Sequence, residues 1–375
     1  MKEIKWQSVK LGEIAIQDRV IITPDSPDIE TRPYLGLDQI EAHTGRILSY
    51  DSTSAEGKSN AFAFDTTHVL YGKLRPYLNK VAVPERKGRC STEIIPLKPK
   101  GVDRDFLGLL LRRSEIVDAA MSEKTGSRMP RADMDSLFSF EVKIPKSIDD
   151  QRNISNCIKA QLSLVEKSQQ AVTEQLSEAS KLADVIIFDS LNKKQVENHK
   201  LGDVLEEVKL GIGKNWAKYP VLGATREGLA PAKEPPGKKP ERYKPAFPGT
   251  IFYNPMRILI GSIAFVDDDD EPGITSPDYV VLKGKEGLVD SRWFYYWLRS
   301  PLGKQCINSL ARGAVRERML FNRLAEGKIT LPGYGIQKLA SQALTALKPM
   351  RAALQHKLDE ITLLPQKILA RAFGG

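Results

Sequence analysis

Side chains that catalyse reactions or bind metal ions are few and scattered in this chain. Its 375 residues include four histidines and three cysteines, Cys90, Cys157 and Cys306. The cysteines lie too far apart in the sequence for the spacing of a zinc site or of a disulfide framework. The sequence also lacks a Gly-x-Ser-x-Gly turn and a phosphate-binding loop. We therefore expect no catalytic residue, no metal site and no cofactor bound by this chain.

Three local patterns could be taken for chemistry, and each has a simpler interpretation. His68 precedes an expected strand and has no second ligand residue near it in the sequence, which favours a structural role. The acidic run 267–271 could bind a cation, but a solvated turn before Pro272 is the simpler interpretation. The segment 253–256 resembles the Asn-Pro-Pro-Tyr signature of amino-methyltransferases, but it lacks the second proline and the final aromatic residue.

Arginine gathers in two short loops that each contain a glycine, at residues 125–131 and 312–318. A guanidinium can donate two parallel hydrogen bonds to guanine O6 and N7 or to a phosphate, so such loops suit contact with DNA. The alternative is a pair of solvated loops whose charges only maintain solubility. We favour DNA contact because the loop occurs twice. The candidate residues are Ser127, Arg128 and Arg131 in the first loop and Arg312, Arg316 and Arg318 in the second.

A second set of polar side chains follows an expected strand in each half of the chain. Lys73 and Arg75 follow one such strand, and Asn254 and Arg257 follow the other. Basic side chains at strand ends suit the anchoring of phosphates, which orients a protein on the duplex. Stacking of the neighbouring tyrosines on bases is an alternative use of the same surface.

The composition fits a globular protein with a polyanionic partner. Hydrophobic residues make up 41% of the chain and charged residues 27%, which are ordinary values. The net charge of +9 suits nucleic acid but does not establish it. The longest apolar run, 258–266, is far shorter than the roughly 20 residues that span a bilayer, and the N-terminus has no apolar signal segment. We expect a cytoplasmic protein without a membrane partner.

The sequence contains an internal repeat. Leu11-Gly12 near the N-terminus has its counterpart in Leu201-Gly202, and further pairs follow in the same order. These pairs are Tyr71 and Tyr253, Arg75 and Arg257, Glu93 and Asp278, Gly126 and Gly313, Pro145 and Pro332, and Gln151 and Gln337. A duplicated unit is typical of a protein that contacts a two-part object.

Each half of the repeat predicts a mixed α/β domain followed by a long helix. The expected divisions are a first domain at 1–147, a helix at 148–192, a second domain at 193–334 and a helix at 335–375. Short apolar runs bounded by glycine and proline predict the strands. We therefore expect an α+β fold with an internal pseudo-two-fold repeat.

Two shorter helices are expected inside the domains, at residues 105–120 and 290–298. The second carries the aromatic run 293–297, which could stack on bases. Its counterpart, 106–110, is aliphatic, so a helix that faces the core is the favoured interpretation.

Both long helices show a heptad pattern. The first seam is Ile158, Leu162, Val165, Gln169, Val172, Leu176, Ala179, Ala183 and Ile186, and the second is Ile336, Ala340, Ala343, Leu347, Met350, Leu354, Lys357, Ile361, Leu364 and Ile368. Alternate spacings of four and three residues predict a coiled-coil seam. Each helix follows its own domain, so antiparallel pairing of the two would hold the domains apart. Packing on the helix's own domain and pairing with another protein are the alternatives.

Taken together, these features resemble the specificity subunit of type I restriction–modification systems. The resemblance covers nearly the whole chain. It rests on the Leu-Gly pairs at 11–12 and 201–202, the segment 69–76, the glycine loops, Ile144-Pro145 and Leu331-Pro332 ahead of Gln151 and Gln337, and the closing segment 368–373.

The resemblance implies a non-catalytic subunit that recognises a DNA sequence and assembles a complex. Such subunits carry two target-recognition domains, which read the two halves of a bipartite asymmetric site in double-stranded DNA. Their paired helices fix the gap between the half-sites and bind two modification subunits, which bring S-adenosylmethionine and methylate adenine. Restriction subunits join this core and use ATP, so these cofactors and Mg²⁺ are expected on the partners.

Three alternatives remain open from the sequence. The chain could be a nuclease or methyltransferase whose site is not recognised, and activity without added subunits would favour this reading. It could be a coiled-coil scaffold for proteins without DNA specificity, which would bind its partners without the steep salt dependence of DNA binding. It could also serve a system that only methylates.

Overall fold

The computed structural model describes residues 4–51, 59–121, 129–193, 196–311 and 318–373. The chain divides into two compact units. Unit 1 comprises Met1–Ala171 and Leu358–Gly375, and unit 2 comprises Val172–Lys357. Each unit therefore combines one half of the repeat with a part of each long helix. Over the described ranges, no helix is both long and apolar enough to cross a membrane.

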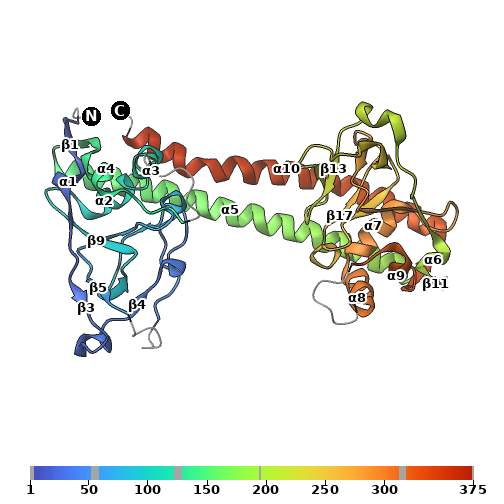
Figure 1. The fold of residues 1–375 in the computed structure, drawn as a ribbon, viewed down its shortest axis with the longest axis horizontal. Helices are drawn as coiled ribbons and strands as arrows, with labels where there is room; N and C mark the ends of the chain where they lie inside the picture. The colour runs from blue at the N-terminus through green and yellow to red at the C-terminus, as the bar shows by residue number, and fades with distance from the viewer. Residues whose placement is uncertain (1–3, 52–58, 122–128, 194–195, 312–317, 374–375) are drawn as a thin grey trace. The chain divides into compact units, whose positions relative to one another are not determined.

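In unit 1 the described strands form three sheets (Figure 1). An antiparallel pair joins β1 (Trp6–Lys10) to β10 (Glu141–Pro145). A four-stranded antiparallel sheet has the order β2 (Ala15–Gln17), β9 (Ile94–Pro99), β6 (Val69–Gly72) and β7 (Val81–Ala82). The third sheet has the order β3 (Ile21–Ile22), β5 (Ala61–Phe64), β8 (Gly88–Ser91) and β4 (Tyr34–Leu35), and β4 runs parallel to β8.

Strand β6 is buried on both faces and contributes to two separate cores. Val69 and Tyr71 belong to the core that also holds Phe106. Leu70, between them in the sequence, belongs to a second core with Phe64. Successive side chains of a strand point to opposite faces of the sheet, so a continuous apolar run fits a strand covered on both sides.

The helices of unit 1 that lie outside the long pair are short. They are α1 (Leu11–Ile14), α2 (Arg104–Leu110), α3 (Ser114–Met121) and α4 (Met134–Ser139). The prediction of a single helix at 105–120 is wrong, because the helix is interrupted between α2 and α3. At the break the Arg112 carbonyl accepts a hydrogen bond from Asn79 Nδ2 at 2.7 Å. In a regular helix this carbonyl would accept a hydrogen bond from a main-chain amide one turn later, but here it accepts one from a distant side chain.

Unit 2 repeats the central sheet of unit 1. Its four-stranded antiparallel sheet has the order β12 (Leu205–Glu207), β19 (Val280–Gly284), β16 (Ile251–Tyr253) and β17 (Ile263–Phe265). An antiparallel pair joins β11 (Val196–Lys200) to β20 (Lys328–Pro332). Both arrangements match their counterparts in unit 1, which confirms the internal repeat. The remaining strands differ, because they form two separate pairs: β13 (Leu222–Ala224) with β14 (Leu229–Pro231), and β15 (Lys244–Ala246) with β18 (Gly273–Thr275).

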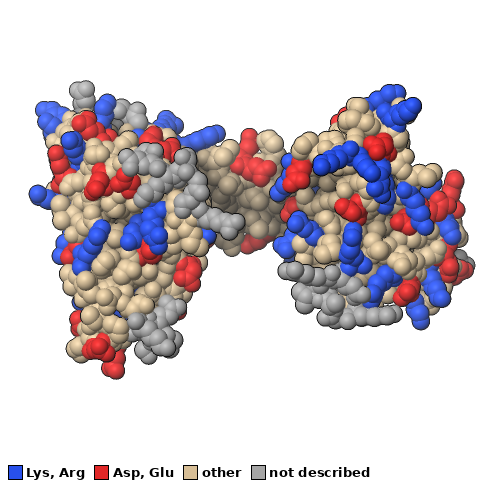
Figure 2. Space-filling view, in the orientation of Figure 1, with Lys and Arg blue, Asp and Glu red and all other residues tan. Residues whose placement is uncertain are grey.

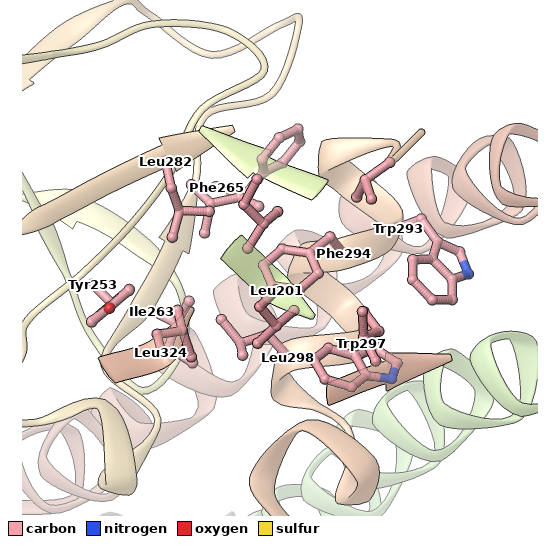
Figure 3. Packing of buried hydrophobic residues seen from close by; sticks show 14 of the residues in the cluster. Leu201, Tyr253, Ile263, Phe265, Leu282, Trp293, Phe294, Trp297, Leu298 and Leu324 are labelled. Atoms are coloured by element: carbon pink, nitrogen blue, oxygen red, sulfur yellow. The ribbon is translucent and has the colours of Figure 1, made fainter. Parts of the chain in front are cut away.

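The aromatic run of unit 2 lies in its core, as predicted. It forms α7 (Ser291–Arg299), which α8 (Pro301–Leu310) follows; α6 (Leu201–Val204) and α9 (Phe321–Leu324) are shorter. Trp293, Phe294 and Trp297 are buried in one apolar cluster (Figure 3). The Trp293 indole N–H donates to Ser190 Oγ at 2.9 Å, which satisfies its only polar group. These rings are therefore not free to stack on bases.

The two long helices are α5 (Ile148–Leu191) and α10 (Tyr334–Phe373). In unit 1, Ile158 near the start of α5 shares a core with Leu369 near the end of α10. In unit 2, Ile187 near the end of α5 shares a core with Leu344 near the start of α10. The helices therefore run antiparallel, as predicted. Every predicted seam position of α5 from Ile158 to Ile186 is buried or half-buried.

The seam of α10 differs from the prediction at four of its ten positions, because Ala343, Met350, Lys357 and Leu364 are exposed. The other six predicted positions are buried or half-buried: Ile336, Ala340, Leu347, Leu354, Ile361 and Ile368. The buried alternates lie one residue later, at Gln337, Leu344, Arg351, Leu358 and Pro365. The prediction was out of phase, because it began at Ile336 with a spacing of four residues, whereas the buried positions begin at Gln337 with a spacing of three.

Candidate nucleic-acid interface

In unit 1 the two predicted basic sets lie side by side. The segment that follows β6 is bonded to the end of the glycine loop, because the Ala132 amide donates to the Lys73 carbonyl at 2.7 Å and the Arg75 amide donates to the Pro130 carbonyl at 2.7 Å. Leu74 and Arg131 form an antiparallel bridge between these contacts. The structure therefore brings Lys73, Arg75 and Arg131 together.

A carboxylate holds the Arg131 guanidinium in place. Arg131 Nη2 donates to Glu93 Oε1 at 2.8 Å, and Nε lies 3.1 Å from both carboxylate oxygens. Lys73 Nζ lies 3.8 Å from Glu93 Oε2. The hydrogen bonds from Arg131 lower the pKa of Glu93 despite its partial burial. Arg131 nevertheless remains 54% exposed, so one edge of the guanidinium is fixed while much of the side chain faces solvent.

Arg75 opens a tight turn with an unusual backbone. Its φ is 52°, and Asn79 at the end of the turn has φ 48°. Residues other than glycine rarely adopt this left-handed conformation, at a cost of order 1 kcal/mol or more. The turn between them presents Tyr77 to solvent. Arg75 is half-buried, and its Nε has no hydrogen-bond partner among the residues that the structure describes.

Unit 2 has the equivalent turn after β16. The Asn254 side chain accepts a hydrogen bond from the Met256 amide at 2.9 Å, and the Asn254 carbonyl accepts one from the Arg257 amide at 2.9 Å. Asn254 therefore shapes the turn that presents the exposed Arg257. The turn ends at Gly261, with φ 86°, at the position equivalent to Asn79.

The arginine that closes the second glycine loop also faces an acid. Arg318 Nη2 donates to Asp278 Oδ1 at 3.4 Å, and Arg318 is 53% exposed. The next residue, Met319, donates its amide to the Pro255 carbonyl at 3.1 Å. Asp278 is the repeat counterpart of Glu93, so both units hold the last arginine of the loop with an acidic residue beside the same sheet. The other loop candidates, Ser127, Arg128, Arg312 and Arg316, lie outside the described residues.

These two acids were not among the functional candidates predicted from the sequence. Glu93 and Asp278 were already paired in the repeat, which was the available signal. Exposed apolar side chains beside Arg257 were also missed, namely Met256, Leu259 and Ile260. Lys and Arg side chains are spread over the visible face of each unit and alternate with acidic ones (Figure 2). The candidate interface is therefore identified by the equivalent positions of its residues in the two units, and not by a continuous basic patch.

His68 is a buried structural residue, as predicted. Its ring nitrogens lie 2.9 Å from Asp65 Oδ1 and 3.1 Å from Asp18 Oδ2. Hydrogen bonds from Lys98 and His68 lower the pKa of Asp18. Burial raises the pKa of Asp65, but hydrogen bonds from Thr67 and the contact with His68 outweigh it and lower the value to about 2.

The acidic run of unit 2 forms a turn in which Asp268, Asp269 and Glu271 are exposed, as expected, but the turn also forms ion pairs that were not expected. Asp267 is buried and forms an ion pair with Arg292 of α7. Asp269 and Asp270 accept hydrogen bonds from Lys348 Nζ of α10, at 2.5 and 2.8 Å. The cations come from distant helices, so the local sequence could not reveal them. In the part of the chain that the structure describes, no group of three or more potential ligands could hold a metal ion.

A polar cavity of about 570 Å³ lies beside this network in unit 2. Its lining includes Arg292, Asp268 and Lys283, and none of the described interface candidates lines it. The cavity and the candidate interface are therefore separate features.

The sequence is similar to one protein family and to one known protein. Residues 3–175 match the family described as Type I restriction modification DNA specificity domain. The type I restriction enzyme EcoDI specificity subunit of Escherichia coli is 24% identical over 183 residues, which are 48% of this chain and 40% of that protein. The match therefore spans less than half of that relative.

One solved structure extends the likeness in fold to the whole chain. One chain, from a structure that concerns complex assembly and conformational transition of the type I R-M system, is 17% identical, with a TM-score of 0.70. The alignment covers 100% of this chain and 99% of that one. The HsdS subunit of Thermoanaerobacter tengcongensis is 19% identical, with a TM-score of 0.49 over 99% of this chain and 97% of that one.

Proposed function

Because residues 3–175 match the family of type I restriction modification DNA specificity domains, we propose that this chain is the specificity subunit of a type I restriction–modification system. In this role it recognises a DNA sequence and performs no catalysis itself. Its two domains read the two halves of a bipartite asymmetric target. The two long helices set the gap between the halves.

One observation carries the proposal most directly: the candidate interface is built twice. In each unit, a turn after the central strand lies against the end of the glycine loop, and an acid holds the last arginine of that loop. Equal frameworks with different loop residues suit the reading of two unlike half-sites, because base contacts specify the sequence while the framework positions them.

The finer assignments are part of the same proposal. Residues 1–147 and 193–334 are the target-recognition domains, and 148–192 and 335–375 are the spacer helices. The residues that contact DNA are the candidates predicted from the sequence: Lys73, Arg75, Ser127, Arg128, Arg131, Asn254, Arg257, Arg312, Arg316 and Arg318. Two modification subunits bind the helices and supply S-adenosylmethionine, and restriction subunits supply the ATP- and Mg²⁺-dependent step, in the cytoplasm.

Long-read sequencing of methylated adenine tests this function. The chain is expressed with its modification subunits in cells that lack other adenine methyltransferases, and cells without this chain serve as the control. We expect one methylated motif with two different halves and a fixed gap, which disappears without the chain. Methylation that persists in the control, or a motif without a gap, would contradict the proposal.

A further inference from the structure

A buried glutamine ties the start of α5 to the domain in unit 1. Gln151 is 0% exposed. Its Oε1 accepts a hydrogen bond from the Asp103 amide at 2.7 Å, and its Nε2 donates to the Pro145 carbonyl at 2.8 Å. Asp103 in turn caps α2, because its Oδ1 accepts a hydrogen bond from the Phe106 amide at 3.0 Å. One side chain of α5 thus bonds the end of β10 and the start of α2.

The same arrangement recurs in unit 2. Gln337 is 1% exposed. Its Oε1 accepts from the Asp290 amide at 3.0 Å, and its Nε2 donates to the Pro332 carbonyl at 2.8 Å and to the Leu288 carbonyl at 2.9 Å. Asp290 caps α7 through the Trp293 amide at 2.9 Å. We call these two sets of contacts the glutamine clamps.

The hydrogen bonds of the clamps depend on direction, whereas the apolar contacts around them do not. The helices also pack through apolar residues such as Ile158 and Leu344, but apolar packing alone permits small rotations and shifts because it does not depend on direction. The clamp bonds are short and point to the main chain of two other elements. Any shift of the helix would leave a buried amide or carbonyl unpaired, which is costly.

We propose that Gln151 and Gln337 are positioning residues that fix the direction in which each long helix leaves its domain. They thereby determine how strictly the chain distinguishes the gap between two half-sites. This inference rests on the proposed function. Neither side chain contacts DNA, because both are buried, so the clamps act on spacing and not on the choice of bases.

The first test measures the clamps themselves. Hydrogen exchange in the full chain is compared between wild type and the variants Gln151→Met and Gln337→Met, which keep a side chain of similar length without its hydrogen bonds. We expect faster exchange at the Asp103 and Asp290 amides, while the Phe106 amide, capped by Asp103, stays protected. The exposed glutamines Gln175 and Gln342, changed to Met, are the matched controls. Unchanged exchange at Asp103 and Asp290 would overturn the proposal.

The second test measures function in the complex with modification subunits. Methylation is compared on a set of targets whose gap is lengthened or shortened by single base pairs. For the double Met variant we expect discrimination between gaps to fall by about tenfold, equivalent to roughly 1.4 kcal/mol, with base preference in each half-site unchanged. A variant that loses the clamp by hydrogen exchange but keeps wild-type discrimination would overturn the proposal.

Two further outcomes are also decisive. If the double Met variant does not fold, the single variants Gln151→Met and Gln337→Met are tested on the same targets, because each keeps the other clamp intact. Failure of both single variants to fold would overturn the proposal, because the glutamines would then serve stability alone. If wild type selects no bipartite target, the proposed function fails instead, and the hydrogen-exchange result still reports on the clamps.

Discussion

The two acid–arginine pairs order the arginine before DNA arrives. A free arginine side chain loses up to about 2 kcal/mol of conformational entropy when it is held in one geometry. Glu93 already restricts Arg131, and Asp278 restricts Arg318. A carboxylate next to each arginine also repels phosphates, which favours contact with the neutral acceptors of base edges, such as guanine O6 and N7, over contact with the backbone. We therefore expect Arg131 and Arg318 to read bases if the proposed function holds.

Arg131 and Lys73 are expected to differ in how their loss affects DNA binding. Arg131→Ala should relax the choice at one base pair and cost about 1–3 kcal/mol on the preferred site. Lys73→Ala should weaken binding to all sequences alike and reduce the salt dependence by about one phosphate contact. Competition binding on all single-base variants of the target, at several salt concentrations, measures both. The exposed Arg19→Ala is the control, and equal losses on all sequences for Arg131→Ala would make it a phosphate contact.

The carboxylates around His68 should make unit 1 sensitive to acid. The pKa of Asp65 is about 2 in the folded protein, below the ordinary value of 3.8 for this side chain. A group with a lowered pKa stabilises the fold above its unfolded value, and this contribution is lost as the pH falls from about 4 towards 2. In urea denaturation, wild type should lose more stability over this pH range than Asp65→Asn. Asp25→Asn, at an exposed site, should behave as wild type.

At the scale of elements, a helix face was predicted correctly where its buried positions carry apolar residues, and less well where they carry polar ones. The seam of α5 was predicted because almost all its members are apolar. Four positions of the α10 seam were missed because the predicted spacing was out of phase there by one residue. Gln337 and Arg351 concealed the true phase, because they place polar residues at positions where apolar ones were expected. Likewise, the adjacency of strand ends and glycine loops followed from the repeat, whereas the partners of Asp267 and Asp269 depend on tertiary contacts that no local pattern encodes.

The corrected seam of α10 predicts unequal effects of two substitutions. Leu344 is 0% exposed and Met350 is 43% exposed. Leu344→Ala should lower the free energy of unfolding by about 2–5 kcal/mol, because it leaves a cavity in a packed core. Met350→Ala should fall within the small range of surface substitutions, about 0.5 kcal/mol. Chemical denaturation of the two variants measures the difference, and similar losses would favour the seam first predicted from the sequence.

At the scale of the whole molecule, the two halves share a framework but differ in detail. The central sheet, the clamp and the acid–arginine pair are duplicated, whereas the second sheet of unit 1 is replaced by two strand pairs in unit 2. The repeated parts are those that connect each domain to the long helices and hold the candidate arginines. The parts that differ are free to vary with the half-site, which agrees with the proposed division between positioning and reading.

The length of the long helices should set the gap between half-sites. Removal of one heptad from each helix, residues 172–178 and 351–357, keeps the seam in phase and shortens the pair by about 10 Å at 1.5 Å per residue. At 3.4 Å per base pair this is about three base pairs. The half-sites would also turn by about a third of a helical turn, so we expect a shorter preferred gap with weaker binding. Methylated-motif sequencing measures the gap, and removal of the α5 heptad alone, which mismatches the helices, is the control. An unchanged gap after the matched deletion would show that the helices do not set it.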